Sequence, residues 1–226
     1  GTLSKLYKIV HDAFKENEAE DFKFTDAEVD DKISFLNIPE FLAEGCAVSN
    51  LLTPDRVVIG HLRGNEASKK ASERVENFYL KFVSKDLIIH LDSISSEMTK
   101  LVSNAFLAQR ISSINSVSEL CEKKFANIKD LSHSVGSDKR IGNRFLKASL
   151  GFGGSCFKKD VLCLIYLLYS LDMPVQANYW SQVLLMNEYQ RIRVCEKIVK
   201  FYKELHKTKE YDNNILNIQF VYDIIL

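Results

Sequence analysis

Apolar and polar positions alternate with helical spacing at the start of the chain. Leu6, Ile9, Val10 and Ala13 recur every three or four residues, so the pattern predicts an amphipathic helix over residues 3–14. The charged stretch that follows, residues 15–31, predicts an exposed loop.

Short apolar runs and one helical pattern occupy the next part of the chain. The runs at 33–36, 56–59 and 87–90 have the length of strands, and a helical pattern covers residues 65–82 between the second and the third. Strands that alternate with a helix are typical of an α/β unit, so we expect one here.

From residue 93 onward the pattern becomes helical. Helical spacing over residues 97–123 predicts one long helix, and further helices are predicted for 127–135, 157–171 and 175–205. The closing segment, 214–226, is apolar and rich in strand-forming residues, and such a segment usually needs neighbours in a sheet. We therefore expect the chain to be a piece of a larger protein.

Composition and charge narrow the classes of function. The 226 residues carry 30 basic and 30 acidic side chains, and the resulting net charge of zero argues against a general nucleic-acid binder. No apolar run approaches the length that crosses a bilayer, so we expect no membrane partner. The five cysteines are irregularly spaced without a Cys-x-x-Cys pair, which predicts neither a disulfide framework nor a metal site and favours a reducing cytoplasm.

A cysteine follows the glycine-rich segment Gly151-Phe152-Gly153-Gly154-Ser155-Cys156 at the predicted start of a helix. Helix N-terminal amides favour the thiolate, which is the nucleophilic form of cysteine, and glycines let a substrate approach the backbone closely. Asp160 lies one helical turn further on and could activate water for a hydrolytic step. On these residues alone, a helix capped by Ser155 with a buried structural cysteine explains the pattern equally well.

The same glycines do not form a dinucleotide-binding loop. They lack the G-x-G-x-x-G spacing and follow no convincing strand, and no other segment supplies that fingerprint. The residues by themselves therefore identify no NAD site.

Other groups could also carry chemistry. Lys100 and Asn104 are one turn apart on the predicted long helix and could stabilise an oxyanion, whereas Glu40 and Glu44 follow a predicted strand. The basic segment 138–147 could bind phosphate. Ordinary solvated surface charge explains each group and is favoured without other evidence.

Several segments nevertheless match one protein family in the same order along the chain. They are Asn37–Gly45, Pro54–Val57, Asn104–Asn115, Arg140–Ser149, Gly151–Phe157, Tyr179–Trp180 and Met186–Arg191. They resemble the UDP-glucose/GDP-mannose dehydrogenase family, and residues 145–149 and 153–157 are closest to its eukaryotic UDP-glucose 6-dehydrogenases. The resemblance covers roughly residues 32–200, so the surface-charge explanations lose most of their weight.

The resemblance implies an α/β fold with a mainly α-helical central domain, a long central helix and partial Rossmann-like pieces at both ends. Residues 1–91 would end an NAD-binding domain, and residues 92–200 would form a central helical domain for dimerisation and substrate binding. Residues 201–226 would begin a UDP-binding domain. NAD is the implied cofactor.

The resemblance also implies a reaction. UDP-glucose would be oxidised to UDP-glucuronate in two hydride transfers, with Cys156 forming a thiohemiacetal and then a thioester. Lys100 would stabilise the oxyanion and Asn104 would help to hold the reacting oxygen or a water. Asp160 and Glu40 would share proton transfer and water activation, in a division that stays open.

The implied partners are the nucleotide sugar and further copies of the chain. Arg140 would reach into the neighbouring subunit's site, which implies a homo-oligomer. Within one subunit, the substrate pocket would be lined by Phe41, Leu42, Ala43, Glu44, Lys147, Phe152, Gly153 and Phe157.

The chain also departs from the family. Ile38 precedes Pro39 where the family usually has asparagine, and Cys46 replaces a residue that is often threonine, so we expect a small buried side chain there. The dinucleotide fingerprint and the bulk of the UDP-binding domain are missing. Two alternatives therefore stay open, namely a non-catalytic fragment that acts as a dimerisation core and a sister dehydrogenase for GDP-mannose or an amino-sugar nucleotide.

Overall fold

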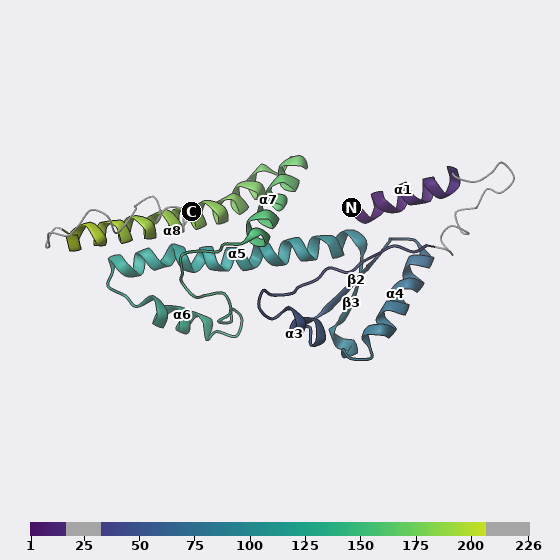
Figure 1. Ribbon diagram of the computed structural model, residues 1–226, viewed down its shortest axis with the longest axis horizontal. Coiled ribbons are helices and arrows are strands. Elements are labelled where there is room, and N and C mark those ends of the chain that lie inside the picture. The colour runs from purple at the N-terminus through teal and green to yellow at the C-terminus, as the bar shows by residue number, and fades with distance from the viewer. Residues whose placement is uncertain (17–32, 207–226) are drawn as a thin grey trace. The chain divides into compact units, whose positions relative to one another are not determined.

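The computed structural model describes residues 1–16 and 33–206 (Figure 1). The fold is α/β, and the chain divides into two compact units between Lys100 and Leu101. The predicted apolar segment 214–226 and most of the predicted charged loop lie outside the described residues.

The first unit contains a three-stranded sheet in the order β1 (Leu36–Asn37), β2 (Val57–His61), β3 (Ile88–Asp92). Strands β2 and β3 are parallel, as a strand–helix–strand connection requires, and β1 runs antiparallel to β2. The crossover is made by α4 (Glu66–Tyr79) and a short 3-10 turn, η1 (Lys85–Leu87). The strands predicted at 56–59 and 87–90 and the helix predicted at 65–82 are therefore confirmed.

Strand β2 is the centre of this unit's core. Val57, Val58 and Ile59 are at most 6% exposed, as expected for a parallel strand that is covered on both faces. Val57 and Ile59 pack with Val83, and partly buried side chains of α4 and β3 surround them.

Helix α1 (Thr2–Glu16) confirms the amphipathic helix predicted at the start of the chain. Its first N–H groups have no partner within the helix, and the Glu97 carboxylate accepts from Thr2 N (2.9 Å) and Leu3 N (2.8 Å). A carboxylate at a helix N-terminus also interacts favourably with the helix dipole. Glu97 therefore ties α1 to the start of α5 (Ser93–Lys123).

The strand predicted at 33–36 is wrong except for Leu36. Strand β1 is only two residues long, because its neighbours are engaged elsewhere. The Phe35 carbonyl accepts from Ser68 Oγ at 2.8 Å instead of pairing with β2. After the end of β1, Pro39 has no backbone N–H that could donate a hydrogen bond to a neighbouring strand. Helix α3 (Ala47–Leu52) follows in a region without a predicted element.

The second unit is helical and confirms the four predicted helices. It contains α5 from Leu101 onward, α6 (Ile128–Gly136), α7 (Ser155–Ser170) and α8 (Pro174–His206). Figure 1 shows α7 and α8 beside α5. Two small side chains of α5, Ala105 and Ala108, are fully buried in the core of this unit. The buried core consists of Ala105 and Ala108 of α5, Val161 and Leu164 of α7, Val183 of α8, and Phe152.

Candidate functional site

The glycine-rich segment ends where α7 begins. Gly151 and Gly154 have φ angles of +119° and +75°, which residues with a side chain rarely adopt. Cys156 is the second residue of α7 and is exposed to solvent, so the alternative of a buried structural cysteine does not hold. The backbone turn therefore presents this thiol at the first turn of a helix.

Side-chain amides from two helices hold this segment in place. Ser149 N donates to Asn115 Oδ1 of α5 (2.9 Å), and Gln190 Nε2 of α8 donates to the Ser149 carbonyl (2.9 Å). Asn187, also on α8, bonds both polar groups of the Phe152 backbone. The sequence alone predicts no role for these amides. Polar residues at core-facing positions of α5 and α8 are the signal that points to them.

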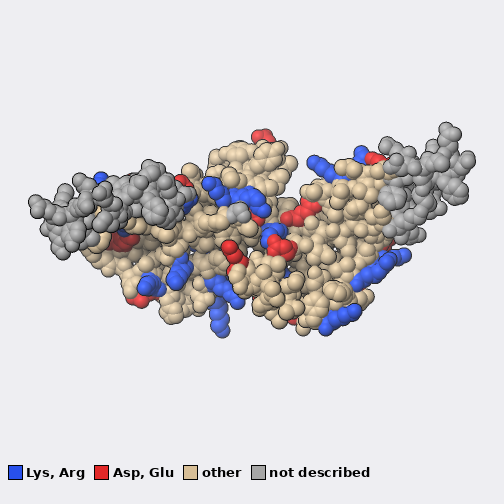
Figure 2. Space-filling model, in the orientation of Figure 1, with Lys and Arg blue, Asp and Glu red and all other residues tan. Residues whose placement is uncertain are grey.

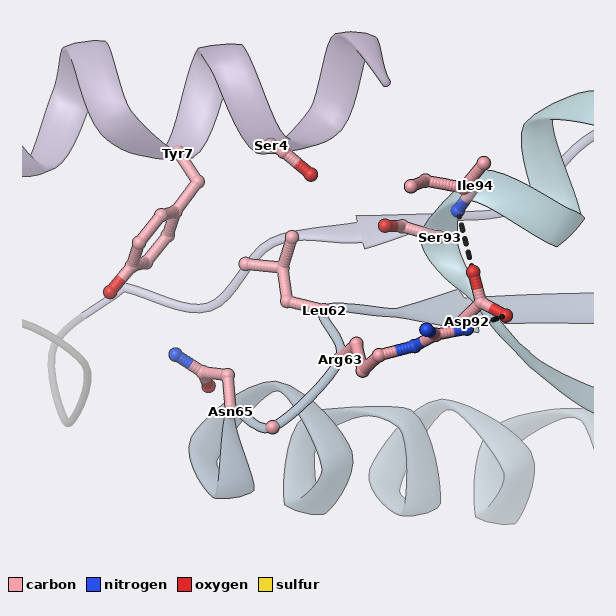
Figure 3. A pocket seen from close by; sticks show the side chains of 9 residues that line it. Ser4, Tyr7, Leu62, Arg63, Asn65, Asp92, Ser93 and Ile94 are labelled. Carbon is pink, nitrogen blue, oxygen red and sulfur yellow. Dashed lines mark hydrogen bonds and ion pairs between the residues drawn. The ribbon is translucent and has the colours of Figure 1, made fainter.

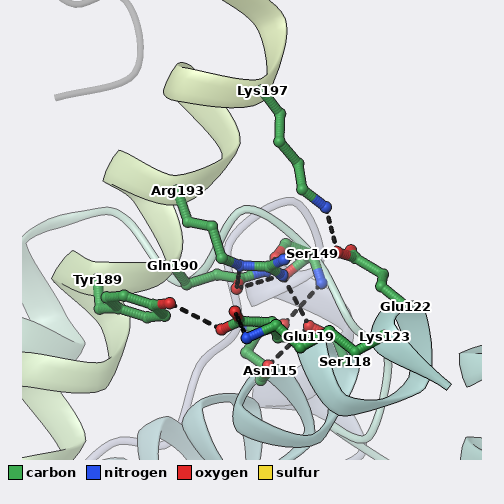
Figure 4. A network of polar contacts seen from close by, with 10 residues as sticks. All are labelled: Asn115, Ser118, Glu119, Glu122, Lys123, Ser149, Tyr189, Gln190, Arg193 and Lys197. Carbon is green, nitrogen blue, oxygen red and sulfur yellow. Dashed lines mark hydrogen bonds and ion pairs between the residues drawn. The ribbon is translucent and has the colours of Figure 1, made fainter. Parts of the chain in front are cut away.

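Figure 4 shows the wider polar network that joins α5 to α8 around these amides. The buried Arg193 guanidinium donates to Glu122 (2.7 Å), Ser118 (3.1 Å) and the Oε1 of Gln190 (3.0 Å). Lys197 also bonds Glu122. Because Arg193 holds the oxygen of Gln190, the Nε2 group of Gln190 is turned toward Ser149.

Asp160 and Asn104 meet between α7 and α5. Asn104 Nδ2 donates to Asp160 Oδ2 at 2.6 Å, and Lys159 Nζ lies 3.5 Å from Asp160 Oδ1. Asp160 is only 8% exposed, whereas Cys156, one turn earlier on the same helix, is exposed. The structure therefore brings together two of the predicted catalytic residues beside the cysteine-bearing turn.

Lys100 and Glu40 form an ion pair within the first unit. Lys100 Nζ lies 3.0 Å from Glu40 Oε1, and the other carboxylate oxygen accepts from Leu42 N at 2.8 Å. The Phe41 ring lies beneath the Arg56 guanidinium, 4.0 Å from the ring centre, and 5.7 Å from Lys100 Nζ. Two cations and one carboxylate thus fix the loop that carries Glu40.

The rest of this loop is held by a side chain of the following helix. Asn50 Oδ1 of α3 accepts from Ala43 N at 2.9 Å, while Leu42, Ala43 and Glu44 are exposed. Cys46 is also exposed, so the expected small buried side chain is wrong. It precedes a short surface helix and has no core to enter.

The loop is anchored at its start by a close approach of two elements. A Cβ at Gly60 of β2 would lie 2.4 Å from Ser96 Cβ of α5, so only glycine fits there. The Ser96 hydroxyl donates to Asn37 Oδ1 at 2.7 Å. Asn37, directly before the loop, is therefore fixed to the start of α5.

The basic segment before the glycine loop contains the remaining predicted residues. Arg140 pairs with Asp138 (2.6 Å) and its side chain is 89% exposed; this bond raises the pKa of Arg140 and lowers that of Asp138. Lys147 is exposed. Arg110 of α5 supports the segment by donating to the carbonyls of Gly142 (2.7 Å) and Arg144 (2.9 Å).

A cavity of about 550 Å³ opens beside the glycine loop in the second unit. Phe152 and Gly153, two predicted substrate-binding residues, line it with Lys158, Glu188 and Arg191. Phe157, a third, packs edge-on against Phe152 with ring centres 5.7 Å apart. Arg191 pairs with Glu188 at 3.4 Å, so Lys158 is the cation of this lining that is not balanced by a lining carboxylate.

Figure 3 shows a second cavity, of about 400 Å³, at the carboxyl ends of β2 and β3. In open α/β sheets, ligands bind at this edge. Here the turn before α4 is held by internal bonds, because Asn65 Oδ1 accepts from Ser68 N (2.7 Å) and Ser68 Oγ from Leu62 N (3.0 Å).

The surface charges, the cysteines and the length of the helices are further features of the described residues. On the face in Figure 2, basic and acidic side chains are interspersed. All five cysteines are free thiols. Among residues 1–16 and 33–206, no helix is long and apolar enough to cross a membrane.

Comparison with known proteins identifies related chains. Residues 94–189 match the central domain of the UDP-glucose/GDP-mannose dehydrogenase family, and residues 1–83 match the family's NAD binding domain. UDP-glucose 6-dehydrogenase of Gallus gallus is 51% identical over 167 residues, 74% of this chain and 34% of that protein. The Caenorhabditis elegans enzyme is 51% identical over 168 residues, 74% of this chain and 35% of that protein.

A solved structure is also similar to this chain. UDP-glucose dehydrogenase of Pyrobaculum islandicum superposes with a TM-score of 0.68 at 34% identity, covering 75% of this chain and 37% of that one. The α/β unit contains the match to the NAD binding domain, and the helical unit contains most of the match to the central domain. The chain belongs to the UDP-glucose/GDP-mannose dehydrogenase family. It spans about a third of the length of the relatives it matches.

Proposed function

We propose that the protein oxidises UDP-glucose to UDP-glucuronate, with NAD taking both hydrides. The observation that carries the proposal is the exposed Cys156 at the first turn of α7, one turn before the buried Asp160–Asn104 pair. A nucleophile beside a positioned carboxylate suits the formation and hydrolysis of an acyl-enzyme. The match to relatives named UDP-glucose 6-dehydrogenase supports the substrate, and the family's NAD binding domain supports the cofactor.

Cys156 would act at the aldehyde stage. Its sulfur adds to the aldehyde carbon, and the carbonyl oxygen takes a proton to give a thiohemiacetal. Loss of a hydride from its carbon to NAD and of the proton from its hydroxyl would convert that adduct into a thioester on Cys156. Water then forms a new C–O bond while the C–S bond breaks, which releases the carboxylate and regenerates the thiol.

The polar residues would manage charge and protons. Lys100 is a cation only 27% exposed, and a partly desolvated ammonium stabilises a developing oxyanion better than one in bulk water. Asn104 would help to hold the reacting oxygen or a water, and Asp160 or Glu40 would take the proton of the attacking water. Asp160 supports this role better by burial, since Glu40 has a 62% exposed side chain.

Substrate binding would fall to the two loops. Phe41, Leu42, Ala43 and Glu44 would bind through the loop after β1, and Lys147, Phe152, Gly153 and Phe157 through the glycine loop. The exposed Lys147 offers a cation for phosphate, and Phe152 and Gly153 line a cavity.

Assembly and domain limits are also proposals. We propose a homo-oligomer in which Arg140 serves the neighbouring subunit's site; its 89% exposed side chain supports this. We propose domain limits at 91/92 and 200/201; the first lies one residue before the junction of β3, which ends at Asp92, with α5, which begins at Ser93. The free thiols support a cytoplasmic location.

The experiment measures NADH formation by the full-length protein with NAD and UDP-glucose, with GDP-mannose as the alternative substrate. We expect NADH from UDP-glucose alone, loss of turnover in Cys156→Ser with retained sugar binding, and full turnover in Cys163→Ser. Cys163 is the matched control because it is an exposed thiol on the same helix. Turnover of GDP-mannose instead, or full activity in Cys156→Ser, would overturn the proposal.

A further inference from the structure

Asn187 of α8 contacts both polar groups of the Phe152 backbone. Phe152 N donates to Asn187 Oδ1 at 2.8 Å, and Asn187 Nδ2 donates to the Phe152 carbonyl at 3.0 Å. Both residues are 6% exposed, so these groups have little access to water. One side-chain amide therefore supplies a hydrogen-bond partner for both the N–H and the carbonyl of Phe152, as the backbone of a neighbouring strand would.

The neighbouring glycine shows how closely this amide fits. A Cβ at Gly151 would lie 2.4 Å from Asn187 Oδ1, and Gly151 has a φ of +119°. Any other residue at this position would push the amide away from the loop. The position of the Asn187 amide therefore requires a glycine at residue 151.

Only two residues separate this contact from the helix that carries Cys156. Phe152 is fixed by Asn187 and by packing into the core, and Gly153 and Gly154 connect it to Ser155, the first residue of α7. The far side of the connection is also fixed, because Val161 of α7 is fully buried. The position of Phe152 therefore limits where the first turn of α7 can lie.

We propose that Asn187 is a positioning residue for Cys156. By holding the Phe152 backbone, it fixes the start of α7 and thereby the direction in which the Cys156 sulfur points. The catalytic consequence rests on the proposed function, whereas the effect on the thiol itself does not.

The test uses Asn187→Asp in the full-length protein. Aspartate keeps an acceptor for Phe152 N–H but replaces the donor with a second oxygen, which faces the Phe152 carbonyl. Asn178→Asp is the matched control, because Asn178 lies on the same helix, is exposed and uses only its acceptor, for the Tyr169 hydroxyl (2.7 Å). Site-resolved alkylation by iodoacetamide, followed by peptide mass spectrometry, reports each cysteine separately.

We expect alkylation of Cys156 to slow about threefold or more relative to Cys163 in Asn187→Asp, since thiol reactivity depends on the helix turn that presents it. The buried Cys121 and Cys195 should stay protected, which a general loosening of the helices would not allow. The kcat for NADH formation should fall about 10- to 100-fold, because a misplaced nucleophile loses its alignment. Asn178→Asp should change neither rate.

The remaining outcomes either overturn the proposed role of Asn187 or show that the proposed function fails independently of that role. An unchanged ratio of Cys156 to Cys163 alkylation would overturn it, and so would labelling of Cys121 and Cys195 together with Cys156. If Asn187→Asp does not fold, Asn187→Ser replaces it, and failure of both would mean that the residue is only structural. If the wild type makes no NADH, the proposed function fails, and the alkylation ratio still decides the role of Asn187.

Discussion

Asn104 and Asp160 form a short hydrogen bond between α5 and α7, with Nδ2 and Oδ2 2.6 Å apart. The carboxylate is 8% exposed and directly precedes Val161, a fully buried residue of the core. A carboxylate with so little water around it depends on its partners, and Asn104 and Lys159 supply them. One oxygen of Asp160 is thereby held by Asn104, which fixes the orientation of the other.

Asp160→Asn should slow turnover without weakening substrate binding. The amide keeps the size of the side chain but cannot take a proton from water, so we expect kcat to fall about 10²- to 10⁴-fold. Stopped-flow NADH formation and intact mass of the acyl-enzyme would show whether the thioester accumulates. Asp130→Asn, an exposed residue on α6, should leave both unchanged. A loss of UDP-glucose affinity with normal kcat would contradict this role.

Lys100→Met should affect turnover far more than stability. Removal of the cation that lies 3.0 Å from Glu40 should lower kcat about 10²- to 10³-fold, if the cation stabilises an oxyanion. The free energy of unfolding should change by about 1 kcal/mol or less, because an ion pair with an exposed partner contributes little. Lys85→Met, which removes the 4.0 Å contact with Glu76, is the control for both measurements. Equal kcat values in the two variants would refute the role.

The elements that the sequence predicted well are those with a strong local pattern. Strand β2 is a continuous apolar run, and α5 keeps its helical spacing through residues 97–123. Local pattern failed where another segment decides the outcome. Strand β1 ends early because Ser68, far along the chain, takes the Phe35 carbonyl.

In the candidate site, too, a strong local pattern could be read from the sequence, whereas contacts between distant segments could not. Cys156 stands out in the sequence because three glycines precede it, so its place at a helix start could be predicted, but its exposure could not, because a buried cysteine fits the same pattern. The pairing of Asn104 with Asp160 required knowledge of how α5 packs against α7. The contact of Asn187 with Phe152 could not be predicted, because a polar residue at a core-facing position indicates a buried partner but does not identify it.

Arg193 and Lys197 bind the same carboxylate but should differ in their effect on stability. The Arg193 side chain is 9% exposed and also bonds Ser118 and Gln190, whereas Lys197 is 51% exposed. Arg193→Ala should lower the free energy of unfolding by about 1.5–3 kcal/mol, because it leaves buried acceptors without their donor. Lys197→Ala should cost about 1 kcal/mol or less. Urea denaturation of both variants measures this difference. Equal losses in the free energy of unfolding would show that burial of the cation does not determine how much it contributes to stability.

Asp92 caps the start of α5, and its titration should be visible in the acid range. Its Oδ2 accepts from the Ser95 hydroxyl (2.8 Å), and its Oδ1 accepts from the backbone N–H groups of Ser95 and Ile94 (3.1 Å each). These bonds, led by the Ser95 hydroxyl, lower the pKa of Asp92 from 3.8 to about 2, and Arg63 adds a smaller contribution. The pKa is lower in the folded state, so the stabilisation is present above pH 3.8 and is lost as the pH falls toward 2.

Ser95→Ala should therefore raise the pKa of Asp92 in the folded state. The pH range over which Asp92 loses its stabilising contribution, between its unfolded and folded pKa values, should then become narrower. Carboxyl NMR titration of the full-length protein would measure the pKa directly, and urea denaturation at several pH values would measure the slope. Asp92→Asn provides the reference, because an amide does not titrate and its contribution to that slope disappears. If Asp92 titrates near 3.8 in the wild type, or if Ser95→Ala leaves its pKa unchanged, the hydroxyl is not the group that favours the charged carboxylate.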